Sequence, residues 1–328
     1  MRFSLVFAAG LLFQAVAVGQ SASMAGSPLV ISVKDFGAEG DWDWGNQTGA
    51  DDTAAFQKAI DYAASPASES AVVYFPAGSY RISSTIYLPN WVRVTGDNGR
   101  NSQIHADPDF ADACMFHAKN GEQSMFNSRL ENLWIRVHDN ARIEAVIRAD
   151  AWQENCGMSG VVITGFTKYG IELQFGYGGA ATLHVEDCEI FAGPSAVEDS
   201  AGIYVHQISL VAAFMLRVDS TTIAGASSAK PLGYGIFMEN DTLAARVVHF
   251  EYARHGVWLE RKSNAILDAL TGSFTRTGSA DLVGLATNWE GFLAGRGLMP
   301  NGFEYTVRDT RSGDHKRGNV SQIDLPQE

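Results

Sequence analysis

The feature that most constrains the fold is a short motif that recurs through the second half of the chain. It is a glycine followed by alternating apolar residues, and it begins at Gly170, Gly202, Gly235 and Gly256. These glycines are 32, 33 and 21 residues apart. A second motif occupies residues 130–135, 158–163, 185–190, 218–223 and 248–253, so that one copy precedes each glycine. A period of 20 to 50 residues with several short strands predicts an all-β solenoid, whose stacked coils share one core.

Alternation within the glycine motif predicts which side chains face that core. The inward side chains are aliphatic or Met, namely Ile171, Leu173, Ile203, Val205, Ile236, Met238, Val257 and Leu259. The residues between them point outward and form two columns. One column holds Glu172, Tyr204, Phe237 and Trp258, and the other holds Gln174, His206, Glu239 and Glu260. Because neighbouring coils lie about 4.8 Å apart, successive repeats become neighbours on one surface.

The composition excludes several other classes of protein. The chain has 328 residues, of which 46% are hydrophobic, so a disordered chain is excluded. Its 33 glycines follow no three-residue period, which excludes a collagen. A formal net charge of −13 argues against a nucleic-acid partner, because a negative surface repels a polyanion. Three cysteines leave at least one unpaired, and we expect none to have a functional role.

The chain divides into a leader and one domain. Arg2, an apolar run and small residues near position 20 predict a signal peptide over residues 1–22. Export to the extracellular space or the periplasm follows, with no membrane association after removal of the signal peptide. Residues 23–328 form one domain: an N-terminal cap and first coils over 23–96, coils over 97–271, and a C-terminal cap over 272–328. Residues 51–64 are expected to form an amphipathic helix capped by Asp51 or Asp52.

The N-terminal segments resemble a known superfamily. They are residues 33–38 (VKDFGA), 51–55 (DDTAA) and 74–81 (YFPAGSYR). Together they are similar to the start of pectate-lyase-like proteins, which include polygalacturonases, rhamnogalacturonases, exo-glucanases, mannuronan epimerases and phage tailspike depolymerases. The resemblance implies a single-stranded right-handed parallel β-helix with a short N-terminal capping helix and a C-terminal cap. Residues 41–50 depart from the usual pattern, because they replace a short acidic turn by a longer segment.

The resemblance does not extend to the catalytic motifs of two member families. The Asn-Thr-Asp, paired-aspartate and Gly-His-Gly motifs of polygalacturonases are absent from the matching positions. Residues 169–174 (YGIELQ) resemble the Tyr-Gly-Phe-Asp-Pro-His run of the epimerases, with Tyr169 at the tyrosine position. Glu172 and Gln174 replace the aspartate and the histidine. Function therefore has to be argued from the site itself.

Two carboxylates in equivalent positions of adjacent coils are the strongest chemical signal. Glycosidic hydrolysis uses a pair of carboxyl groups that flank one bond. Glu239 and Glu260 are the predicted catalytic pair, with Glu172 as an alternative carboxylate and His206 in support. The other interpretation is a row of solvated acidic side chains and an exposed histidine.

Aromatic and basic residues around the pair predict a substrate-binding surface, because sugar rings stack on aromatic faces. The predicted binding residues are Tyr169, Gln174, Tyr204, Phe237, Trp258, Arg254, His255 and Lys168. A cross-strand aromatic ladder that only stabilises the sheet is the alternative.

Three functions remain open at this stage. The favoured one is a secreted glycoside hydrolase acting on a polysaccharide. The second is a lyase or C5-epimerase on uronic-acid polymers, which would use Tyr169, Arg254 or His255. The third is a non-catalytic carbohydrate-binding or surface protein. No cofactor is expected, although calcium could bind at Asp41 and Asp43 or at Asp51 and Asp52. Both a monomer and a homo-oligomer are open.

Overall fold

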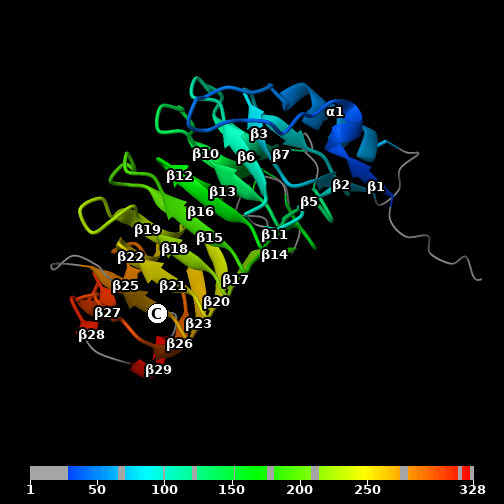
Figure 1. Cartoon of the computed structure of the whole chain (residues 1–328). Helices are drawn as coiled ribbons and strands as arrows, with labels where there is room; N and C mark the ends of the chain where they lie inside the picture. Colours follow the sequence, from blue (N-terminus) through cyan, green and yellow to red (C-terminus); the bar gives the residue numbers. More distant parts are fainter. Residues whose placement is uncertain are drawn as a thin grey trace, which may run out of the picture.

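The computed structural model describes residues 29–65, 71–98, 100–119, 124–150, 152–175, 181–207, 214–273, 280–316 and 320–325. The chain forms a stack of coils that begins at helix α1 (Thr53–Ala63) and ends at strands β28 (His315–Lys316) and β29 (Val320–Leu325) (Figure 1). This is the predicted all-β parallel β-helix. The predicted signal peptide, residues 1–22, lies outside the described residues. Among those residues, no helix is both long and apolar enough to span a membrane.

Three sheets run along the described part of the stack, and each full coil contributes one strand to each sheet. The eleven-stranded sheet contains β1 (Val30–Ser32), β2 (Val72–Phe75), β5 (Arg93–Gly96), β8 (Arg129–Glu131), β11 (Gly157–Ser159), β14 (Ala181–Glu186), β17 (Phe214–Asp219), β20 (Asp241–Arg246), β23 (Ser263–Asp268), β26 (Leu293–Leu298) and β29. The ten-stranded sheet contains β4 (Ile86–Leu88), β7 (Cys114–Ala118), β10 (Ala145–Ala149), β13 (Tyr169–Phe175), β16 (Ala201–Gln207), β19 (Leu232–Met238), β22 (Ala253–Leu259), β25 (Asp281–Leu285), β27 (Tyr305–Asp309) and β28. The eight-stranded sheet contains β3 (Gly78–Ile82), β6 (Ser102–Ala106), β9 (Trp134–Arg136), β12 (Val162–Phe166), β15 (Glu189–Ala192), β18 (Thr222–Ala224), β21 (His249–Glu251) and β24 (Thr271–Ser273).

The glycine motifs form β13, β16, β19 and β22 of the ten-stranded sheet, and their register is the predicted one. Ile171 pairs with Ile203, which pairs with Ile236, which in turn pairs with Val257. All eight predicted inward side chains are buried in the core. Burial of such apolar columns is the main favourable contribution to the stability of a solenoid.

The second motif is not one strand but a corner between two strands. In the first four copies, one residue has a positive φ and turns the chain from the eleven-stranded to the eight-stranded sheet: Asn132, Gly160, Asp187 and Ser220. Val247, directly before the copy at 248–253, and Ala269 make the same turn in the next two coils. Asparagine and glycine tolerate this left-handed conformation, whereas a β-branched residue such as Val247 is strained there.

The N-terminal end is closed by α1 and a short 3₁₀ helix, η1 (Val33–Phe36). Helix α1 buries Phe56 and Ile60 against the first coils. Asp52 is its N-cap residue, but the Asp52 carboxylate accepts hydrogen bonds from the backbone N–H groups of Glu39 and Gly40. The neighbouring Asp51 carboxylate instead accepts the N–H of Thr53. Asp52 thus occupies the N-cap position, whereas Asp51 supplies the side-chain hydrogen bond to the first turn.

The stack continues past residue 271, where the sequence pattern predicts the start of the C-terminal cap. Strands β25 and β27 extend the ten-stranded sheet in parallel, and β26 extends the eleven-stranded sheet. Only β28 and β29 close the described end. Strand β28 pairs antiparallel with β27, and β29 pairs antiparallel with β26. The inward pattern persists at Val283 and Leu285, although Leu282 replaces the glycine that marks earlier coils.

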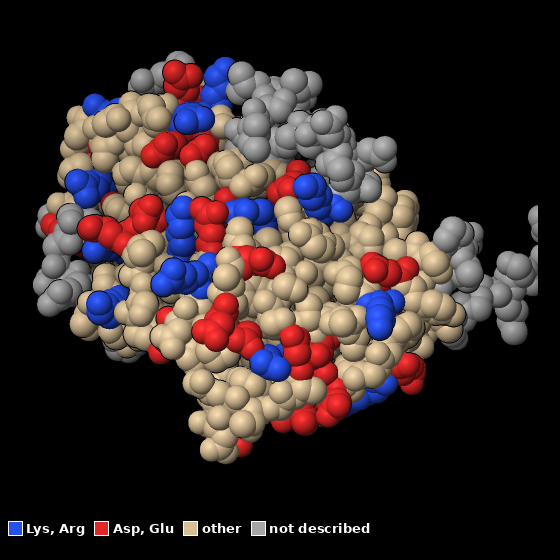
Figure 2. Space-filling view, turned by 90° about the horizontal axis from the view of Figure 1, so that it is seen from above, with Lys and Arg blue, Asp and Glu red and all other residues tan. Residues whose placement is uncertain are grey.

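The cysteines pack in the interior of the described coils, and the surface carries charges of both signs. Cys114, Cys156 and Cys188 are free and buried. Burial raises the pKa of the Cys156 thiol to about 11, so it stays protonated. On the face shown in Figure 2, acidic and basic side chains lie beside one another in small groups.

Candidate functional site

The outer face of the ten-stranded sheet carries the predicted columns of polar and aromatic residues. Glu172 pairs with Tyr204, Tyr204 with Phe237, and Phe237 with Trp258. The Tyr204 and Phe237 ring centroids are 5.1 Å apart. Tyr169 and Tyr234 join this stripe, at 4.8 Å from Tyr204 and Phe237 respectively. The stripe is therefore a continuous aromatic surface across four coils.

The second column is also formed as predicted. Gln174 pairs with His206 in adjacent strands. Glu239 and Glu260 follow directly after β19 and β22, and their backbone N–H groups donate to the carbonyls of Val205 and Met238. These two hydrogen bonds continue the strand register, so Glu239 and Glu260 lie on adjacent coils at equivalent positions. Neighbouring strands are about 4.8 Å apart.

Glu172 faces outward but lies at the centre of a hydrogen-bonded cluster that excludes solvent. Its side chain is 5% exposed, and Oε2 is 2.6 Å from the Arg148 guanidinium. Oε1 accepts a hydrogen bond of 2.8 Å from Gln174 and lies 3.3 Å from Nε2 of His206. Burial alone would raise the pKa of Glu172, but His206, Gln174 and Arg148 outweigh it and lower the pKa to about 2. Glu172 is thus held as a carboxylate that orients its neighbours.

Glu239 and Glu260 are more accessible and have separate partners. The Tyr204 hydroxyl donates to Oε1 of Glu239 at 2.6 Å, and Arg261 lies 3.6 Å from its Oε2. The Trp258 indole N–H donates to Glu260 Oε1 at 3.1 Å. His206 stacks on the Tyr204 ring, with 4.9 Å between centroids and 7° between planes. Tyr204 therefore links Glu239 to His206 and, through it, to Glu172.

Lys168 and Tyr169 lie at the edge of the same face. The Lys168 ammonium is 2.8 Å from Glu144 Oε1 and 4.8 Å from the centre of the Tyr169 ring. Its hydrogen bond with Glu144 raises the pKa of Lys168, so the side chain is a stable cation. Glu144 also accepts a hydrogen bond of 2.8 Å from Arg148.

A second polar cluster surrounds His255 at the C-terminal end of the face. His255 Nδ1 is 2.9 Å from Oδ1 of Asp281, whose side chain is fully buried in β25. Burial raises the pKa of Asp281, although the nearby His255 opposes this. Tyr234 stacks on the His255 ring at 5.1 Å, and Arg254 forms an ion pair with Glu198.

An open pocket of about 380 Å³ adjoins this cluster, and it is lined by Glu198, Asp199, Gly233, Tyr234, Arg254 and His255. His255 therefore contacts a buried carboxylate on one side and borders a polar pocket on the other.

Most of the chain matches one protein family. The family profile described as "Rhamnogalacturonase A/epimerase, pectate lyase-like" matches residues 30–278 of the 328. The chain belongs to this family. No curated protein matches the chain significantly.

Solved structures share the fold of this member of the rhamnogalacturonase A/epimerase family at low identity. The phiAB6 tailspike, in complex with oligosaccharides of Acinetobacter baumannii surface polysaccharide, has 16% identity and a TM-score of 0.52. The alignment covers 85% of this chain and 46% of that one. PfbA, a surface adhesin of Streptococcus pneumoniae, has 11% identity, a TM-score of 0.51, and coverage of 91% and 100%.

A tailspike mutant of E. coli bacteriophage HK620, in complex with a pentasaccharide, has 14% identity and a TM-score of 0.51. The alignment covers 85% of this chain and 63% of the HK620 chain. The chain thus spans less than two thirds of either tailspike. At these identities the likeness concerns the fold alone.

Four functional candidates of this family member escaped the sequence analysis. Arg148, Glu144, Asp150 and Asp281 were not among the predicted site residues. Asp150 Oδ2 lies 2.7 Å from His117 Nε2, on the N-terminal side of the Glu172 cluster. Strands β10 and β25 lack the glycine that marks the motif, so only the alternation of residues 145–149 and 281–285 could have revealed their place in the register.

The aspartates proposed for calcium bind backbone groups instead. Asp43 accepts hydrogen bonds from the N–H groups of Gly45 and Asn46, and Asp41 accepts the N–H of Ala50. Within the described ranges, no three His, Cys, Asp or Glu side chains gather as metal ligands. The expectation of no cofactor, with calcium as a possible ligand of these aspartates, stays a prediction.

Proposed function

We propose that this protein is an enzyme that cleaves glycosidic bonds of a polysaccharide by hydrolysis, with Glu239 and Glu260 as the carboxylate pair. The substrate would lie along the outer face of the ten-stranded sheet. The observation that supports this is the placement of two accessible carboxylates at equivalent positions of adjacent coils, beside the aromatic stripe of Tyr204, Phe237 and Trp258.

The spacing of adjacent coils favours one form of the reaction. A strand separation of about 4.8 Å is close to the ~5–5.5 Å between carboxyl groups in retaining glycosidases, and well below the ~6.5–9.5 Å of inverting enzymes. In a retaining reaction, one carboxylate attacks the anomeric carbon while the other carboxyl group protonates the leaving oxygen. Water then releases the glycosyl group from the enzyme.

The partners of the two glutamates suggest how these roles divide. Glu239 accepts the Tyr204 hydroxyl hydrogen bond and lies 3.6 Å from Arg261, and these two contacts hold its carboxylate in place. We assign Glu239 as the nucleophile and Glu260 as the acid. Glu172 and His206 position the Tyr204 ring, and through it the hydroxyl that contacts Glu239.

Glu239→Gln and Glu260→Gln test this assignment on acidic and neutral polysaccharides, with release of reducing ends as the readout. We expect each variant to lose at least ~10³-fold in kcat. Glu251→Gln, a half-exposed glutamate on the eight-stranded sheet, is the matched control and should retain full activity. Full activity in both site variants would refute the carboxylate mechanism.

A second candidate function is a lyase or C5-epimerase on a uronic-acid polymer. The His255–Asp281 pair favours it, because Asp281 at Nδ1 leaves Nε2 of His255 free to remove a proton. Abstraction of the proton next to the sugar carboxylate, followed by loss of the C4 oxygen, gives an unsaturated sugar. Return of the proton to the other face gives the epimer. Arg254 would neutralise the sugar carboxylate by exchanging its partner Glu198.

The products distinguish these functions. Ultraviolet absorbance of an unsaturated product, lost in His255→Asn but kept in Glu260→Gln, would support the lyase. New reducing ends without that absorbance would support the hydrolase. Retention on a glycan without any product would indicate a non-catalytic binding protein. Secretion belongs to the same proposal and is tested by recovery of the chain, without residues 1–22, outside the cytoplasm.

A further inference from the structure

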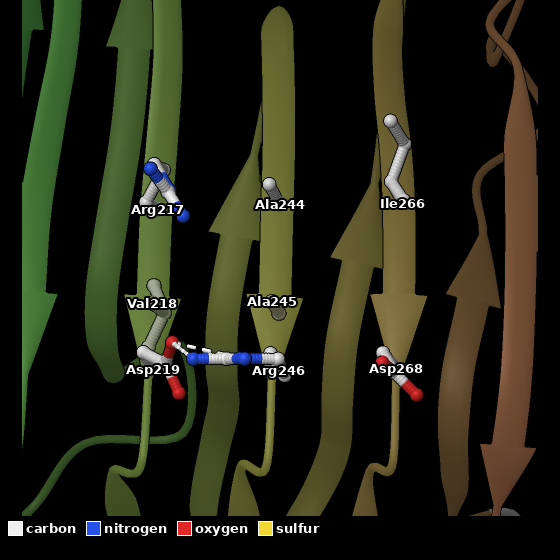
Figure 3. Close-up of a pocket in the computed structure, with 8 residues that line it drawn as sticks. All are labelled: Arg217, Val218, Asp219, Ala244, Ala245, Arg246, Ile266 and Asp268. Carbon is white, nitrogen blue, oxygen red and sulfur yellow. Dashed lines mark hydrogen bonds and ion pairs between the residues drawn. The ribbon is translucent and has the colours of Figure 1, made fainter.

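The outer face of the eleven-stranded sheet, on a different side of each coil from the glutamate pair, carries rows of residues in a regular order. In one row the charges alternate: Asp219 pairs with Arg246, Arg246 with Asp268, and Asp268 with Arg296. Figure 3 shows the first three of these side chains at one level of strands β17, β20 and β23. Arg246 contacts Asp219 at 2.5 Å, and Arg296 contacts Asp268 at 2.7 Å.

The neighbouring row alternates in size rather than in charge. Arg217 pairs with Ala244, Ala244 with Ile266, and Ile266 with Ala294. Ile266 is 50% exposed, which is unusual for a large aliphatic side chain in the middle of a sheet. Two shallow hollows of about 230 and 430 Å³ adjoin it, and both are lined in part by Ile266 and Asp268.

We propose that this face binds the same face of a second copy of the chain. The two copies would be related by a two-fold axis parallel to the strands, running between β20 and β23. Such an axis places each row of one copy opposite the same row of the other copy, with the coils in the reverse order. The charge row Asp-Arg-Asp-Arg then faces Arg-Asp-Arg-Asp, so every acid meets a base.

The same axis makes the size row complementary. Ile266 of each copy faces Ala244 of the other, and Arg217 faces Ala294, so a large side chain meets a small one at all four positions. A single axis that satisfies two independent rows is the observation that selects a second copy as the occupant. Binding of a glycan would not require the charges along the row to be complementary to the same row in the reverse order.

The size of the contact sets the expected strength. Six strands, from β14 to β29, give a footprint of about 29 Å by 20 Å, or ~600 Å² per copy. A standard interface buries about 800 Å² per partner, so this one lies at the transient end of the range. We expect a dissociation constant in the micromolar range.

Sedimentation velocity over roughly 1–100 μM protein tests the proposal, because this range spans the expected dissociation constant. The wild-type chain should shift from monomer to dimer. Asp268→Arg alone places two like-charged pairs across the axis and should weaken association at least ~10-fold. The double variant Arg246→Asp with Asp268→Arg gives Asp-Asp-Arg-Arg, which is again complementary to its own reversal, so it should dimerise nearly as well as the wild type.

The double variant separates an intermolecular role from a stabilising role within one chain. Both variants keep only one opposite-charge step of the three along the row, so thermal unfolding should show a similar loss of stability in each. Ile266→Lys should abolish dimerisation. Val197→Lys should not, because Val197 is a comparably exposed apolar residue outside the proposed interface. A wild-type chain that stays monomeric throughout, or a double variant as weak as the single, would overturn the proposal. Neither outcome depends on the proposed enzymatic function.

Discussion

Replacing Glu172 by glutamine removes a buried negative charge while keeping the shape of the side chain. The surrounding contacts lower the pKa of this carboxyl from 4.5 to about 2, a change of roughly 2.5 units. At 1.36 kcal/mol per unit, the charged form contributes about 3 kcal/mol to the free energy of unfolding near neutral pH. We expect Glu172→Gln to lose about this amount at pH 7.

The pH dependence provides the sharper test. Because the pKa of Glu172 is depressed in the folded state, its stabilisation is fully present above pH 4.5 and is lost as the pH falls toward 2. Urea unfolding of wild type and Glu172→Gln at several pH values should therefore show a difference that shrinks below pH 4.5. Glu251→Gln, whose partner is His249 at 3.3 Å on a half-exposed surface, should change stability by less than ~1 kcal/mol. A difference between the wild type and the Glu172→Gln variant that is equal at pH 7 and pH 3 would contradict the electrostatic origin of the effect.

Three further substitutions test other parts of the structure. Tyr204→Phe removes the 2.6 Å hydrogen bond to Glu239 and should lower kcat about 10-fold in the reducing-end assay, while leaving KM nearly unchanged. Val247→Asn relieves a β-branched residue at φ 53° and should raise the free energy of unfolding by about 1 kcal/mol in urea. Gly235→Ala places a methyl group against the Phe250 ring and the Gly256 carbonyl, so the midpoint of thermal unfolding should fall, with a cost of at least ~2 kcal/mol.

The repeat in the sequence was sufficient to predict the fold and the inward columns, because each side chain there has one requirement, which is to be apolar and to alternate. Ile171, Ile203, Ile236 and Val257 meet that requirement at visible spacings. The same reasoning failed to place strands whose motif glycine is replaced. Leu282 stands at the glycine position of β25 and packs against Gly256, so the coil persists where the sequence motif does not.

The environment of the site was harder to predict, because it depends on residues of coils that the motif did not mark. Glu172 was expected as an exposed carboxylate with a possible catalytic role. Its burial follows from Arg148, which lies in register with it on β10, a strand whose motif position holds Val146 in place of glycine. Likewise, Asp281 behind His255 comes from a coil assigned to the cap. An outward residue in a solenoid is defined by its neighbours above and below, so one missed coil changes the chemistry of the next.

The two ends of the outer face of the ten-stranded sheet differ in how their carboxylates are paired with cations. At the N-terminal end, Glu144 and Glu172 are both paired with Arg148, and Glu144 also with Lys168, so the carboxylates there are neutralised and serve to build the cluster. At the C-terminal end, Arg261 is the cation that contacts Glu239, at 3.6 Å, and Glu260 accepts only the neutral Trp258 indole among the contacts described. Glu239 and Glu260 therefore have fewer charged protein partners than Glu144 and Glu172 among the contacts described. This contrast supports the proposal that a substrate engages the C-terminal end of the face, where the aromatic stripe also ends.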